Sequence, residues 1–374
     1  MSLHVHWFLP THGDGRTIKR RASDGVGARA AQRAPARDYL AQVAGAADQL
    51  GFDGALVPAG LFCEDPWLVT AALAQSTRHL SFMVAFRPSL LSPTLAAQMA
   101  ATAQRLSGGR LLLNVVVGGD RDEQLRYGDR LEHDQRYGQA AEFLTVMQGA
   151  WSGRPFDFVG THYLVQGALT ARPPDPPPPV FLGGSSTAAR QVAARHADVY
   201  LAWGEPPPAL RRLVDEARAL ASAAGRTISV GTRFHVISRD TAAAAWAVAD
   251  ELVAELDPDL VRAAQQRFSR SESEGQRRMA ALHQGRTDGL EVYPNVWAGY
   301  GLLRPGAGAA LVGSHDEVAD RICELHELGI EHLILSGQPH LEEAYWFGEG
   351  VLPLLRRRGL VDRDPAGSEQ HRAA

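Results

Sequence analysis

The chain of 374 residues is 45% hydrophobic, enough to bury a large core, and its Gly 37 and Pro 22 stay well below the content typical of disordered sequence. Lys and Arg number 38 against 42 Asp and Glu, so the net charge of −4 gives no basic footprint for binding nucleic acid. No apolar run approaches the roughly 18 residues of a membrane span, residues 1–10 lack a secretory signal, and two cysteines provide no disulfide framework, so we expect a cytoplasmic protein.

Short β-rich apolar runs alternate with longer stretches of helical periodicity, which is typical of a parallel sheet with crossover helices. Eight strands are predicted, at residues 4–9, 54–58, 80–86, 111–117, 180–183, 199–203, 228–238 and 332–336. Because eight parallel βα repeats close into a barrel, we expect an α/β fold, a (β/α)8 TIM-type barrel forming a single domain over residues 1–355. A doubly wound open sheet is the alternative, but no G-x-G-x-x-G follows the first strand.

Three segments fall outside this repeat. Residues 14–37 are basic without apolar periodicity, and we expect an extended mobile loop with a solvated surface. The longest insertion, residues 239–331, lies between the seventh and eighth strands, and its Gly-rich part at about 285–313 is predicted to be a mobile lid, since long loops in compact domains are usually functional. The polar residues 356–374 are expected to form a flexible tail.

The seventh strand carries the most informative polar pair. Arg233 and His235 are two residues apart and so share one face of the strand, whereas Phe234 and Val236 take the other. A buried guanidinium needs an acidic partner or an anionic ligand. Two interpretations follow, a salt bridge to an acid on another strand or an anion clamp beside a titratable imidazole.

A candidate phosphate cradle follows the fifth strand. Gly184, Ser185 and Ser186 precede a helical stretch, residues 187–196, whose start offers free N–H groups and a positive dipole end. An ordinary strand-to-helix turn has the same composition. Asn114 is the one amide of the apolar fourth strand, where it would contact a heterocycle, a water or a backbone group.

Further candidates lie where the mouth of a barrel is expected. Trp203 would stack on a planar ring or fill the core, and His340 would face the mouth. Cys63 would be reactive or merely small and buried. His133 and Tyr137 open a helix and would reach a phosphate or solvent. No metal-binding spacing such as H-E-x-x-H or paired C-x-x-C occurs, so we expect no metal site.

Longer segments, in order along nearly the whole chain, resemble the two-component alkanesulfonate monooxygenases that use reduced FMN, in the bacterial luciferase-like group of flavin barrels. These segments are residues 7–15, 63–65, 87–89, 181–186, 203–207, 276–283, 295–299 and 339–345. The resemblance implies a TIM-type barrel, a homodimer or homotetramer, and a separate NAD(P)H-dependent flavin reductase that supplies the reduced FMN.

The resemblance also implies roles for individual residues. The catalytic residues would be Arg233, His235, His340 and Cys63; Trp203, Arg304 and Gln338 would bind the substrate; and Asn114, His133, Tyr137, Gly184, Ser185 and Ser186 would hold the flavin and its phosphate. The chain departs from the family at Gln338, where the family has a Tyr proposed as an acid/base group, and in the longer loop at 14–37. Because Gln cannot titrate, His235 or His340 would take that role, or the substrate differs.

The reaction that the resemblance implies uses reduced FMN and O2 to cleave the C–S bond of an alkanesulfonate, giving an aldehyde and sulfite. The nearest alternative is another luciferase-like barrel that oxidises a sulfone, an alkane or an amine, or a deazaflavin-dependent oxidoreductase that does not use oxygen. More distant are a non-redox barrel enzyme acting on a phosphosugar and a flavin-binding protein without activity. We expect neither nucleic acid nor a membrane as a partner.

Overall fold

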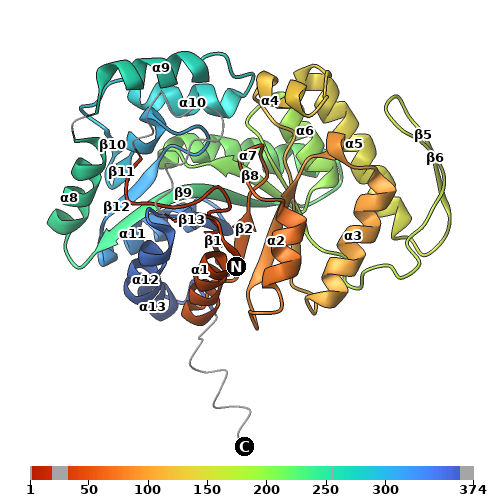
Figure 1. Cartoon of the computed structure of the whole chain (residues 1–374), viewed down its shortest axis with the longest axis horizontal. Helices are drawn as coiled ribbons and strands as arrows, with labels where there is room; N and C mark the ends of the chain where they lie inside the picture. Colours follow the sequence, from red (N-terminus) through yellow and green to blue (C-terminus); the bar gives the residue numbers. More distant parts are fainter. Residues whose placement is uncertain (1, 19–32, 255, 363–374) are drawn as a thin grey trace, which may run out of the picture.

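The computed structural model describes residues 2–18, 33–254 and 256–362 (Figure 1). Eight parallel strands pair side by side, and the pairing of β8 with β9 closes them into a barrel. In pairing order they are β1 (His4–Phe8), β2 (Gly54–Val57), β3 (Ser81–Phe86), β4 (Leu111–Val115), β7 (Val180–Gly183), β8 (Val199–Trp203), β9 (Ser229–Arg239) and β13 (His332–Ser336). The predicted (β/α)8 barrel is confirmed, and every predicted strand coincides with one of these eight.

Helices on the outside connect the strands. They are α1 (Arg37–Leu50), α2 (Pro66–Leu73), α3 (Pro93–Leu106), α4 (Arg121–Arg126), α5 (His133–Ala150), α6 (Thr187–His196), α7 (Pro207–Ala223), α12 (His340–Gly350) and α13 (Leu352–Arg357), with a 3-10 turn η1 (Pro88–Leu90). Asp65, Ser92 and Ser186 each begin a helix by accepting a backbone N–H three residues ahead. Sequence features at these strand-to-helix turns therefore fix where several helices start.

Apolar side chains fill the inside of the barrel below its mouth. Phe8, Leu56, Met83, Phe181 and Ile334 form this inner cluster, each at most 5% exposed. The outward faces of the same strands pack under the helices, as the alternation of side chains along a strand requires. The interior is thus packed solid, and ligands can only be bound at an end of the barrel.

The excursion between β9 and β13 builds a second small layer. It contains α8 (Ala242–Val253), α9 (Pro258–Phe268), α10 (Glu274–His283), β10 (Glu291–Tyr293), β11 (Val296–Trp297), η2 (Gly299–Leu302), β12 (Ala310–Ser314) and α11 (His315–Glu327). β12 pairs with the last five residues of β9, and β11 and β10 continue this sheet antiparallel. In Figure 1, α9 and α10 lie along one edge of the molecule above these strands.

The segment 285–313 is therefore not a plain loop. β9 has eleven residues, which is more than its neighbours in the barrel pair with. Its carboxyl-terminal end therefore pairs with β12, a strand that the sequence did not predict. Residues 296–303 and 307–312 are all buried in this sheet and its packing. That the segment also moves as a lid stays a prediction.

The two other unusual segments are anchored more firmly than expected. The base of the 14–37 loop is closed by paired backbone hydrogen bonds between Asp14 and Arg33, both 3.0 Å, and the predicted mobility falls mainly on residues 19–32, outside the described residues. The tail begins later than predicted, because Leu3 N donates to Leu360 O at 2.8 Å and Val361 is 4% exposed. Residues 363–374 again lie outside the described part.

A hairpin of β5 (Phe156–Val159) and β6 (Leu164–Ala168) at the edge of the molecule was not expected from the sequence (Figure 1). Its strands are short and mostly exposed, so they lack the apolar signal that identified the barrel strands. In the described ranges, no helix combines the length and the apolar character needed to cross a bilayer.

Two imidazoles toward the amino-terminal ends of β1 and β13 predict that the fold is sensitive to acid. His6 Nε2 lies 3.2 Å from His332 Nδ1, and burial lowers the pKa of both side chains, that of His6 to about 4. An unfolded His titrates near about 6.5, so between these values the unfolded chain binds more protons and stability falls as the pH falls. Each His contributes up to about 1.4 kcal/mol per pH unit.

We expect His6→Gln to flatten the loss of stability between about pH 6.5 and pH 4. His4→Gln is the control, since the partly exposed His4 pairs with Asp53, which raises its pKa. Urea unfolding of the three proteins at several pH values measures the difference. An identical slope for wild type and His6→Gln would show that this cluster does not set the acid sensitivity.

Candidate active site

The mouth formed by the carboxyl ends of the strands gathers the predicted catalytic residues. The Arg233 guanidinium lies 4.4 Å above the ring of Phe8, and the His340 ring lies 5.5 Å from the same ring. Cys63 and Arg304 both lie close enough to Arg233 to interact with it electrostatically. Side chains from β1, β9, the loop after β2, the excursion and the start of α12 thus meet at one place.

Arg233 has no acidic partner among residues 2–18, 33–254 and 256–362. No carboxylate or other acceptor of a described residue forms an ion pair or hydrogen bond with its guanidinium, and its Nε is buried without a hydrogen bond. Burial, together with the nearby charge of Arg304, lowers the pKa of Arg233 to about 10, so the group is still a cation at neutral pH. The salt-bridge interpretation of this residue is therefore wrong within the described chain, and a partly accessible cation is available to an anionic ligand.

His235 is held by the protein at both ring nitrogens. Nε2 lies 3.1 Å from Ala307 O, which can only accept, so Nε2 carries the proton and Nδ1 accepts from Ser336 Oγ at 2.9 Å. The ring also stacks on Tyr300 at 3.9 Å, and burial lowers its pKa well below the usual range. A neutral ring with no free nitrogen suits positioning of the neighbouring loop, while its predicted catalytic role stays a prediction.

Two of the predicted residues contact the start of the 14–37 loop. His340 Nδ1 lies 3.0 Å from Asp14 Oδ1, and both side chains are at most 3% exposed. The Gln338 amide donates to Thr17 O, while its Oε1 is buried without a partner. The beginning of this loop therefore lies against the mouth rather than apart from it.

Cys63 and Trp203 complete the mouth. Burial raises the pKa of the Cys63 thiol, so the thiol remains protonated and is not an activated nucleophile. Trp203 ends β8 below α10, where a Cβ on Gly275 would come within 3.0 Å of its ring. The excursion thus covers this side of the mouth directly.

The residues predicted to form a phosphate cradle lie close together in the structure. Gly184 has φ +142°, and a Cβ there would lie 2.5 Å from the Tyr137 hydroxyl, so glycine lets that hydroxyl approach the start of α6. Burial raises the pKa of Tyr137 to about 12, and its hydroxyl therefore remains a donor. The His133 ring lies 5.1 Å from that of Tyr137, and Ser185 and Ser186 complete the turn. Five of the six residues predicted to hold a flavin thus lie around this turn.

The sixth, Asn114, lies on β4 between Leu112 and Val116, which pack inside the barrel. Alternation along the strand points its amide the same way. The amide is 8% exposed and forms no hydrogen bond with any described residue. A buried amide without protein partners is suited to a polar ligand.

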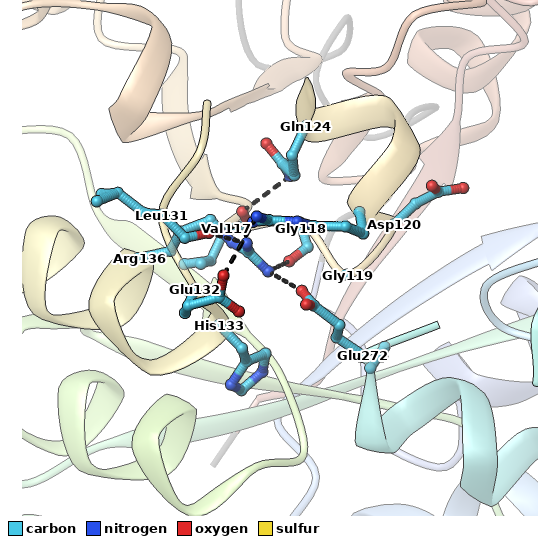
Figure 2. Close-up of polar contacts among 12 residues, drawn as sticks. Val117, Gly118, Gly119, Asp120, Gln124, Leu131, Glu132, His133, Arg136 and Glu272 are labelled. Carbon is cyan, nitrogen blue, oxygen red and sulfur yellow. Dashed lines mark hydrogen bonds and ion pairs between the residues drawn. The ribbon is translucent and has the colours of Figure 1, made fainter. Parts of the chain in front are cut away.

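An ion pair holds the excursion against the loop after β4 (Figure 2). Arg136, with a side chain 1% exposed, donates to Glu272 at 2.5 Å, to Leu131 O at 2.6 Å and to Gly118 O at 3.4 Å. Glu272 N also donates to Gly119 O at 3.0 Å. This pair therefore sets the position of α10, which begins two residues later above Trp203 and Ser185.

Glu272→Gln is expected to destabilise the fold by about 2 kcal/mol, because it leaves the buried Arg136 cation without its counterion. Asp259→Asn is the matched control, since Asp259 pairs with Arg262 on the exposed surface of the same excursion. Urea unfolding compares the two variants. Equal midpoints would show that the Arg136 pair does not stabilise this layer.

Sequence reasoning missed three residues of the site. Asp14, Arg136 and Tyr300 contact His340, Glu272 and His235 respectively, each across more than sixty residues of chain. A single sequence carries no signal for such pairs. Only Asp14 had a local hint, its place shortly after the first strand, where a barrel mouth is expected.

Comparison with known proteins adds an independent finding. The family described as luciferase-like monooxygenase matches residues 3–332. A riboflavin lyase, RcaE, crystallised with modified FMN and riboflavin, aligns with a TM-score of 0.80 and 23% identity over 98% of this chain and 94% of its own. The EDTA monooxygenase EmoA from Chelativorans sp. BNC1 aligns at 0.77 and 23% over 98% and 96%, and the long-chain alkane monooxygenase LadA at 0.77 and 20% over 97% and 93%.

Proposed function

Because the chain belongs to the luciferase-like monooxygenase family, we propose that it uses reduced FMN and O2 to oxygenate an alkanesulfonate at the carbon that bears sulfur. The reaction consumes one sulfonate, one O2 and one reduced FMN, and it yields an aldehyde, hydrogen sulfite, water and oxidised FMN. The C–S bond breaks with both of its electrons leaving on sulfur. The single observation that carries the sulfonate proposal is Arg233, a cation at the mouth without an acidic partner in the described chain.

The residues at the mouth fit FMN. Gly184, Ser185 and Ser186 form the turn at the start of α6, beside the Tyr137 and His133 side chains, which would supply donors for a phosphate. The Asn114 amide, which is buried and forms no hydrogen bond with a described residue, would contact the flavin ring. When bound, reduced FMN would supply the electrons for oxygen chemistry.

The protein's own groups would bind and shield the substrate. A sulfonate stays anionic at physiological pH, so Arg233 would hold it through charge-assisted hydrogen bonds, each contributing on the order of 1.5 to 3 kcal/mol. Arg304 lies near Arg233, so its positive charge would add to the attraction of the mouth for an anion. The excursion over Trp203 would exclude water from the mouth, a requirement when a reactive oxygen species must not escape into solvent.

A polycarboxylate is the second candidate, since carboxylates match a guanidinium as well as sulfonates do. The EDTA monooxygenase among the structural neighbours acts on such a compound. A purely apolar alkane is disfavoured, because nothing in it would compensate the desolvated Arg233 cation.

Sulfite release by the purified protein, supplied with photoreduced FMN and sulfonates from methyl to decyl, tests the proposal. We expect sulfite with at least one chain length, and none when O2 is removed. If a polycarboxylate is oxidised and no sulfonate releases sulfite, the sulfonate proposal is wrong and the substrate is a polycarboxylate. Turnover without O2 would instead indicate a deazaflavin-type oxidoreductase, and an absence of flavin binding would exclude both.

A further inference from the structure

We propose that Asp14 is a positioning residue for the reaction: it fixes the ring of His340 so that Nε2 is presented as a proton acceptor at the mouth. This inference rests on the proposed function for its kinetic test, but the geometry behind it is independent of the substrate.

The carboxylate of Asp14 is fully engaged. Oδ1 accepts from Gly15 N at 2.8 Å and from His340 Nδ1 at 3.0 Å, and Oδ2 accepts from His340 N at 2.7 Å and from the Tyr39 hydroxyl. Burial alone would raise the pKa of Asp14, but the hydrogen bonds from His340 and Tyr39 bring it below its usual range. Asp14 is therefore an anion that accepts from four donors.

This arrangement fixes the tautomer of His340. An ionised carboxylate can only accept, so the proton of the neutral ring must be on Nδ1, and Nε2 keeps its lone pair. No described residue hydrogen-bonds to Nε2. The backbone N of His340 donates to the same carboxylate, and Trp7 Nε1 donates to His340 O at 3.1 Å, so the ring cannot turn without breaking its own anchor.

The ring of His340 lies at the mouth of the barrel. The His340 ring packs against the ring of Phe8, and the Arg233 guanidinium lies over that same Phe8 ring. The other histidines near it are His12, with its ring 6.4 Å away, and His235, with which it interacts electrostatically. His235 has both nitrogens engaged, and Gln338 cannot titrate. His340 is therefore the best-placed proton acceptor beside a sulfonate held on Arg233.

Asp14→Asn removes the charge and replaces one acceptor oxygen by a donor NH2 group. We expect kcat for sulfite release to fall about 100-fold, in the range of a lost general base, with reduced-FMN affinity unchanged. The effect should disappear in a His340→Ala background, because a residue that acts through His340 has nothing left to position. A full additional loss in that background would overturn the proposal.

Glu342→Gln is the matched control. Glu342 lies on the same helix as His340, α12, and does not contact it. It pairs with Arg33 at the base of the loop that begins at Asp14. If Asp14 acted only by anchoring the loop, Glu342→Gln would reproduce the loss of kcat. We expect activity close to wild type, as for most partly exposed ion pairs.

Nitrogen NMR of histidine-labelled protein needs no substrate and separates this inference from the proposed function. With His340→Ala to assign the signal, wild type should show the proton on Nδ1 of His340, and Asp14→Asn should move it wholly or partly to Nε2. An unchanged signal, or a wild-type proton on Nε2, would overturn the positioning role. If no sulfonate releases sulfite while the NMR result is as expected, the proposed substrate fails and the role of Asp14 stands.

Discussion

Arg233→Ala is expected to reduce kcat/KM for sulfite release about 100-fold, the effect of losing one or two charge-assisted hydrogen bonds to an anion. The reason is that the Arg233 guanidinium has no carboxylate to neutralise it within the described chain, so a substrate anion would compensate its desolvation. Stopped-flow sulfite assays with photoreduced FMN measure the change. Flavin titration of the same variant provides the control and should give wild-type affinity.

Arg233→Lys separates charge from geometry. Lysine keeps a cation but not the planar fork that matches a sulfonate, so partial activity is expected. Wild-type turnover in Arg233→Ala would remove the central support for an anionic substrate. A loss of flavin binding in both variants would instead place Arg233 at the cofactor.

Gly184→Ala should weaken binding of reduced FMN by about 100-fold, through displaced phosphate donors. The added Cβ would lie 2.5 Å from the Tyr137 hydroxyl and 2.7 Å from Ala189 Cβ, at a φ of +142° that side chains rarely adopt. Either Tyr137 or the start of α6 must move, and both belong to the proposed phosphate site.

Gly183→Ala is a matched control one residue earlier on β7. Its Cβ would meet Leu201 at 3.7 Å, an ordinary contact, so flavin affinity should stay near that of wild type. Anaerobic titration followed by flavin absorbance gives both dissociation constants. Equal affinity in Gly184→Ala and wild type would show that the phosphate is bound elsewhere.

The barrel could be predicted because its strands are short apolar runs with helical periodicity between them. The period of two placed Arg233 and His235 on one face, and the turn at Gly184 preceded a helix with a Ser cap, both as the structure has them. Local patterns of this kind are set by neighbouring residues, so one sequence contains them.

Pairs between distant parts of the chain could not be predicted. The extension of β9 into β12, the Asp14 contact to His340 and the Arg136 contact to Glu272 depend on how separate segments pack. The sequence also left open whether Arg233 had an acidic partner, since any of many acids could have reached it. The structure was needed to show that no described one does.

Direct competition between an alkanesulfonate and the methyl sulfone of the same chain length tests the central claim most directly. The two compounds share the alkyl chain and the oxidised sulfur, but only the sulfonate carries a charge. We predict that reduced FMN and O2 cleave the sulfonate with release of sulfite and leave the sulfone unreacted. Equal turnover of the neutral sulfone would contradict a mouth that selects its substrate through Arg233.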